Sequence, residues 1–171
     1  KAKGYLELFL YANETRKLAD NNNLIDFSIC DSFHQNLLLY SIKSKYYSGV
    51  QYFLRVYDIN EGNSKGTNSF HLACATGVSR LVEFLVESLG ISNTERQKKP
   101  QNPININKVD DDGMTGFHYA CLSGDLATVK YLSELDGISI DEKDYRGSTP
   151  FYYACKLNYF EIVKFLAAKI E

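Results

Sequence analysis

The fold of this chain is decided by one stretch, which reads Gly113-Met114-Thr115-Gly116-Phe117-His118-Tyr119-Ala120-Cys121. Residues 66–74 and 147–155 repeat its pattern, each beginning with glycine and ending with Ala-Cys. The first glycines of successive copies are 47 residues apart (66 to 113) and 34 residues apart (113 to 147). A repeat period in this range predicts a solenoid, in which each unit packs only against its neighbours.

The pattern resembles the ankyrin repeat, whose usual signature is G-x-T-P-L-H-x-A-A, then a glycine, then V-V-x-L-L. This resemblance implies an all-α fold: a solenoid of about five stacked helix-turn-helix repeats with hairpin-like loops between them. We expect residues 1–171 to form a single ankyrin-repeat domain. Its repeats are expected at residues 1–26, 27–59, 60–106, 107–139 and 140–171, with an insertion at 91–103 in the third.

Each residue of the motif has a structural role. The glycine permits the positive φ of a tight turn, and Thr115 caps the helix that follows. Gly116 stands where the family has proline, whereas His34 and Asn158 stand at positions where other copies have glycine. At the place of His71 and its counterpart in the next copy, the family's imidazole usually hydrogen-bonds the backbone of the adjoining loop. Because these histidines recur with the repeat, we favour this structural role over catalysis or metal binding.

Three of the four cysteines, Cys74, Cys121 and Cys155, occupy one equivalent position in the motif, and Cys30 falls outside it. No C-x-x-C pair is present, which argues against a zinc site. We therefore expect the three to be small buried hydrophobic residues. Free buried thiols fit a reducing compartment.

The sequence lacks the motifs of most catalytic chemistries. We find no phosphate-binding glycine loop, no G-x-S-x-G and no H-E-x-x-H. The acidic run 110–112 precedes a glycine, but Tyr119 stands where a calcium-binding loop needs glutamate. We expect no catalytic, cofactor-binding or metal-binding residues, and no enzymatic activity. The net charge of −2 gives no sign of a nucleic-acid partner, and no apolar run is long enough to span a membrane.

We expect a non-catalytic module that binds another protein through its concave face and loop tips, where the family places its variable positions. The candidate contacts are Phe33, Lys65, Asp111, Asp112, Met114, Leu122, Tyr145, Arg146 and Lys156. The five tyrosines of the second repeat are either binding anchors or packing residues of a divergent repeat, and both readings stay open. They are Tyr40, Tyr46, Tyr47, Tyr52 and Tyr57. For the insertion, we favour a surface loop over a partner contact.

The alternative is a regulatory or targeting ankyrin segment of a larger protein: an enzyme, a channel or a secreted bacterial effector. A terminal repeat should present a polar outer face, but the last helix ends with five apolar residues, so either further repeats or another surface is expected to cover it. They are Phe165, Leu166, Ala167, Ala168 and Ile170. We expect an intracellular, cytoplasmic location, which would be the host cytoplasm for a bacterial effector.

Overall fold

The computed structural model describes residues 30–88 and 104–170, and in these ranges it contains helices and no strands. The predicted first repeat (1–26) and the insertion (91–103) lie outside the described residues. The helices are α2 (Leu37–Lys43), α3 (Tyr47–Phe53), α4 (Ser69–Ala75), α5 (Ser79–Ser88), α6 (Gly116–Ser123), α7 (Leu126–Ser133), α8 (Pro150–Lys156) and α9 (Phe160–Ile170).

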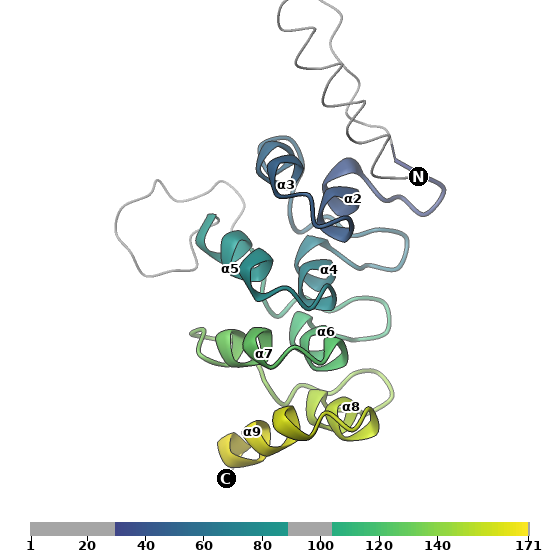
Figure 1. Ribbon diagram of the computed structural model, residues 1–171. Coiled ribbons are helices and arrows are strands. Elements are labelled where there is room, and N and C mark those ends of the chain that lie inside the picture. The colour runs from purple at the N-terminus through teal and green to yellow at the C-terminus, as the bar shows by residue number, and fades with distance from the viewer. Residues whose placement is uncertain (1–29, 89–103, 171) are drawn as a thin grey trace, which may run out of the picture.

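The helices form four antiparallel pairs that stack in chain order (Figure 1). The first helices of the pairs, α2, α4, α6 and α8, make one layer, and the second helices make the other (Figure 1). Within the first layer α4 packs against α2 and α6, and α6 packs against α8. The loops that join one pair to the next project beyond this first layer (Figure 1). This arrangement confirms the predicted all-α stacked-repeat fold and is consistent with a count of five.

Each first helix begins at a residue whose side chain caps it. The side chains of Asn36, Asn68, Thr115 and Thr149 accept a hydrogen bond from the backbone N–H three residues on. Such a cap satisfies one of the amides that a helix start leaves without an intrahelical partner. The four helices therefore start in register, and the loops before them are held in equivalent positions.

Two turns in every pair need a residue with positive φ, and three residues other than glycine fill this role, among them Lys45 (φ 58°) between α2 and α3. His34 has φ 55° where the other repeats have glycine, and Asn158 has φ 58° in the turn between α8 and α9. Asparagine tolerates this left-handed region better than most residues, whereas histidine adopts it less often. Both substitutions predicted from the repeat alignment are confirmed.

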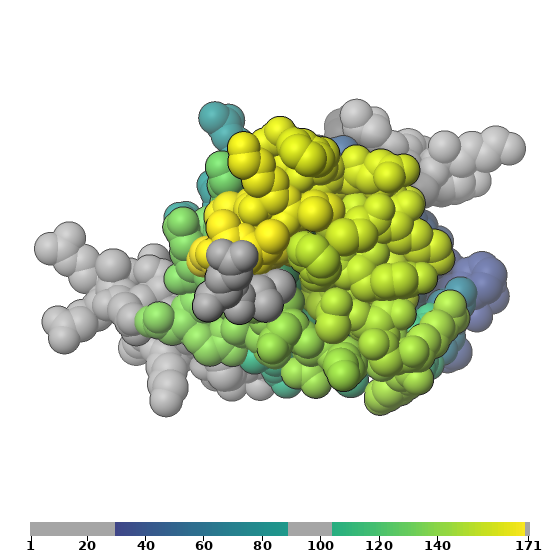
Figure 2. All heavy atoms as spheres, turned by 90° about the horizontal axis from the view of Figure 1, so that it is seen from below, coloured from purple at the N-terminus to yellow at the C-terminus, as the bar shows by residue number. Residues whose placement is uncertain are grey.

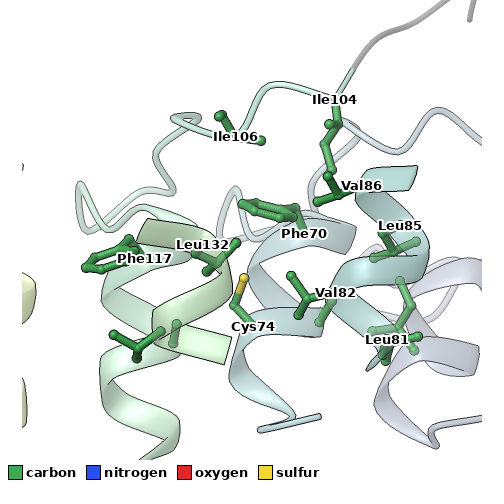
Figure 3. Close-up of a cluster of buried hydrophobic side chains, with 14 of the residues drawn as sticks. Phe70, Cys74, Leu81, Val82, Leu85, Val86, Ile104, Ile106, Phe117 and Leu132 are labelled. Atoms are coloured by element: carbon green, nitrogen blue, oxygen red, sulfur yellow. The ribbon is translucent and has the colours of Figure 1, made fainter. Parts of the chain in front are cut away.

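One continuous hydrophobic core runs through the stack, between the two helix layers. In its centre Phe70 and Cys74 of α4 lie beside Val82 and Leu85 of α5 (Figure 3). Cys74 and Cys121 are fully buried, as predicted, but the prediction for Cys155 is wrong because this thiol is exposed. Its counterparts are covered by the helix pair that follows them. No helix of the described residues has the length and apolarity that crossing a membrane requires.

Candidate partner-binding surface

The tips of the loops before the first helices are joined by backbone hydrogen bonds. The Ser64 N–H donates to the Phe33 carbonyl (2.9 Å), and the Asp111 N–H donates to the Lys65 carbonyl (3.1 Å). The third bond runs from the Tyr145 N–H to the Asp112 carbonyl, at 3.0 Å. These bonds join four loops into one continuous strip, which we call the loop ridge and define as residues 32–33, 64–65, 111–112 and 145–146.

The loop ridge carries exposed aromatic side chains at its two ends and charges between them. Phe33 is 58 % exposed and Tyr145 is 73 % exposed. Lys65, Asp111 and Arg146 are exposed as well. The Arg146 guanidinium lies 3.5 Å from the carboxylate of the neighbouring loop, but both groups face solvent. An ion pair of this kind contributes little to stability, so its charges remain available to a partner.

Three of the four loop turns are tied to their own helix by an aspartate. Asp110 Oδ1 accepts the N–H groups of Asp112 (3.0 Å) and Met114 (2.9 Å), while Oδ2 accepts the hydroxyl of Tyr119 (2.6 Å). Asp31 with Tyr40, and Asp144 with Tyr153, repeat this arrangement. In the third repeat Asn63 accepts the two turn amides, but leucine replaces the tyrosine.

The Asp–Tyr pair positions the loop ridge relative to the first helices, and sequence reasoning missed it. Its signal was present as an aspartate followed by a tyrosine nine residues later, in three repeats. The pKa shifts agree with this pairing. The hydrogen bond from Tyr40 is the largest cause that lowers the pKa of Asp31, and a hydrogen bond from a backbone N–H is the next. The same contact raises the pKa of the Tyr40 hydroxyl, so the proton stays on the tyrosine and the carboxylate stays ionised.

The two motif histidines bridge neighbouring repeats. His71 Nε2 lies 2.7 Å from the Lys108 carbonyl, and His118 Nε2 lies 3.2 Å from the Ser148 carbonyl. In both, Nδ1 accepts the backbone N–H of the helix cap at 3.1 Å, so Nε2 carries the donating proton. This confirms the predicted hydrogen bond to the adjoining loop, and it uses both ring nitrogens within the fold.

The family comparison agrees with this geometry. A family model described as "Ankyrin repeats (3 copies)" matches residues 97–171. Residues 97–171 are therefore similar to ankyrin repeats. The comparison with curated proteins gave no match. Ankyrin repeats are generally protein–protein interaction modules and are typically not enzymes. Helices α2 to α5 lie before the matched range, yet α2 and α4 have the same kind of side-chain cap as α6 and α8, and their turns also have positive φ.

Six of the nine candidate contacts lie on the loop ridge: Phe33, Lys65, Asp111, Asp112, Tyr145 and Arg146. Leu122 is half-buried and Lys156 is exposed, and both lie at the far ends of α6 and α8, about 10 Å from the caps. Met114 is only 9 % exposed. It lies just inside the turn, where its N–H is bound by Asp110. Met114 therefore offers a partner little surface.

The tyrosines of the predicted second repeat are mainly packing residues. Tyr46, Tyr52 and Tyr57 are half-buried against the core. The Tyr40 hydroxyl donates a hydrogen bond to the Asp31 carboxylate, and of these five side chains only Tyr47 is exposed. These positions support the packing alternative for four of the five.

Acidification is expected to destabilise the fold through the two histidines. Burial is the largest cause that lowers the pKa of His71 and of His118 below the ordinary 6.5. Their contribution is fully present above pH 6.5 and is lost as pH falls from there towards the lower folded pKa. Each histidine gives a slope of up to about 1.4 kcal/mol per pH unit in this window. Urea unfolding at pH 7.5, 6.5 and 5.5 measures it.

The matched variant is His118→Gln, which cannot titrate. Its urea midpoint should fall less steeply between pH 6.5 and 5.5 than that of the original protein. Equal slopes in the two proteins would show that His118 protonation does not drive the loss.

Proposed function

We propose that this chain is a non-catalytic protein-interaction module whose partner binds along the loop ridge and the adjoining concave face of the first helices. The observation that carries the proposal is the series of backbone hydrogen bonds from Phe33 to Tyr145 across four loops. It holds side chains from distant parts of the sequence in one fixed strip. A surface that is ordered before binding loses little conformational entropy when the partner arrives.

The chemistry of the loop ridge favours a protein partner. Exposed tyrosine and phenylalanine are effective anchors, because each buries a large rigid area on binding. Between them the two basic side chains, Lys65 and Arg146, balance the two acidic ones, Asp111 and Asp112. A strip without net charge offers no strong attraction to a polyanion such as nucleic acid, but it can select a protein surface of complementary pattern.

The test is a double variant on the loop ridge, Tyr145→Ala with Arg146→Ala. We expect affinity for a partner purified by capture on the original protein to fall at least tenfold, as for an interface hot spot. Both side chains are exposed, so the melting temperature should stay within about 2 °C. Calorimetry or surface plasmon resonance measures the affinity.

The control combines the same residue types on the second helices, Tyr47→Ala with Arg80→Ala. These side chains are also exposed, but they belong to α3 and α5 and not to the loop ridge. The control should bind as the original protein does. If it loses affinity while the ridge variant keeps it, the partner binds the second-helix layer and the proposed surface is wrong.

A second candidate is a regulatory or targeting ankyrin segment of a larger protein, such as an enzyme, a channel or a secreted bacterial effector. The exposed Cys155 on α8, at a position buried in earlier repeats, favours it. An antibody to the chain would detect a protein well above 19.4 kDa in the source cells, and a band at that mass would exclude this candidate.

We propose an intracellular, cytoplasmic location, the host cytoplasm in the case of an effector. All four cysteines are unpaired, which is typical of proteins in reducing compartments. Cell fractionation with an antibody to the chain tests this, and recovery from an oxidising compartment such as the secretory lumen would contradict it.

A further inference from the structure

One face of the last described helix pair is uncovered at positions that are covered everywhere else. Phe70 and Phe117 are buried, whereas the equivalent Phe151 is half-buried. Cys74 and Cys121 are fully buried, whereas the equivalent thiol of α8 is exposed. We call this the α8/α9 end face and define it by four side chains: Phe151, Tyr152, Cys155 and Val163.

The other two positions of the α8/α9 end face follow the same rule. His71 and His118 are fully buried, but Tyr152 at their place is 48 % exposed. Val82 and Val129 are fully buried as well, whereas Val163 of α9 is half-buried. Figure 2 looks onto this side of the molecule, which is formed largely by α8 and α9. The α8/α9 end face thus has the residues of a repeat–repeat interface, but no following helix pair packs on it among the described residues.

The preceding repeats show what such an interface receives. Helix α6 lies on α4 so closely that a Cβ atom at Gly116 would come within 2.5 Å of the Phe70 ring and 3.3 Å of Cys74 Sγ. The loop before α6 also supplies the Lys108 carbonyl to the His71 imidazole. The complement is therefore a helix with a small or tightly fitting first residue, preceded by a loop with a free carbonyl.

We infer that the α8/α9 end face is an internal interface, covered in the natural protein by one more helix-turn-helix repeat of the same chain. Its first helix lies on α8 as α8 lies on α6, and its loop offers a backbone carbonyl to the Tyr152 hydroxyl. The inference rests on continuity with the α4–α6 and α6–α8 interfaces. It does not depend on the loop ridge or on its partner.

Cys155 is a built-in reporter for this inference. In the 171-residue chain its exposed thiol should react with a maleimide at a rate similar to that of Cys30, which is exposed at the other end of the described stack. The natural protein, isolated from its source cells, should label Cys155 at least about 100-fold more slowly, because the thiol becomes accessible only by local opening. Cys30 should react at its former rate in both, and mass spectrometry of the labelled peptides separates the two sites.

Removing the sequence that follows residue 171 from the natural protein should restore fast labelling of Cys155. Three results would overturn the inference. One is equal labelling of Cys155 in both proteins, including the case in which the natural chain has no further repeat. Another is protection that persists after the removal, which assigns the face to a different protein. The third is protection in the 171-residue chain that rises with its concentration, which assigns the face to a second copy.

Discussion

Replacing Phe117 with alanine is expected to lower the free energy of unfolding by about 3–5 kcal/mol. The Phe117 side chain of α6 is fully buried in the hydrophobic core, to which Leu132 of the second layer also belongs (Figure 3). Truncation to alanine removes the ring's packing contacts with the surrounding core and leaves a cavity that the rigid helix stack cannot close. A loss of this size is a large part of the roughly 5–15 kcal/mol that stabilises an ordinary domain. Urea unfolding followed by circular dichroism at 222 nm at pH 7.5 measures it.

The matched variant is Phe151→Ala, which removes the same ring from the same repeat position of α8. Phe151 is half-buried because no described residues cover it on the side away from α6. Phe151→Ala should lower the free energy of unfolding by less than half as much as Phe117→Ala. Less apolar area returns to water, and solvent fills the space that the ring leaves. Similar losses in both variants would mean that the α8/α9 end face is already covered in solution.

The repeat architecture could be predicted from the sequence because its signals are local. The glycine of each turn, the capping residue two positions later and the small pair in the middle of the first helix recur at fixed offsets. In the divergent second repeat, His34 has the positive φ that its alignment with glycine requires. The histidine bonds to the next loop followed from the same alignment.

The surface was harder to predict, because it depends on contacts between repeats. Alignment placed Met114 among the variable positions, but its location just inside the Asp110 turn buries it. Cys155 matches its buried counterparts in sequence and differs only in having no covering helix pair among the described residues. The loop ridge joins residues that lie about thirty or more positions apart, such as Lys65 and Asp111, through backbone atoms. Backbone bonds of this kind leave no mark on residue types.

Substituting proline for Gly116 is expected to destabilise the protein by about 2–3 kcal/mol, although proline is the family's usual residue there. Thr149-Pro150 shows that the stack accepts proline at this position in another repeat. At Gly116, however, a Cβ atom would lie 2.5 Å and 2.7 Å from two carbons of the Phe70 ring. Phe70 is only 1 % exposed, and close-packed protein interiors leave a buried ring little room to move. Gly116→Ala should also destabilise the protein, because the clash with Phe70 arises at Cβ and does not need the rest of the proline ring.

The same substitution at the equivalent place in the third repeat should have the opposite sign. Ser69 is the first residue of α4, it already carries a Cβ, and its buried hydroxyl has no hydrogen-bond partner among the described residues. Proline suits this first helical position, since the N–H it lacks has no intrahelical acceptor. Ser69→Pro removes the unsatisfied hydroxyl and restricts the unfolded chain, so we expect a gain of about 0.5–1.5 kcal/mol.

Urea unfolding of the two proline variants under one set of conditions decides between local packing and family preference. If preference for proline at the first helical position dominated, both variants would be stabilised. If proline were poorly tolerated in these short helices, both would be destabilised. Opposite signs would show that the ring of Phe70, and not the helix start itself, requires glycine at position 116. The close approach of α6 to α4 would then be the feature that sets the spacing between these two repeats.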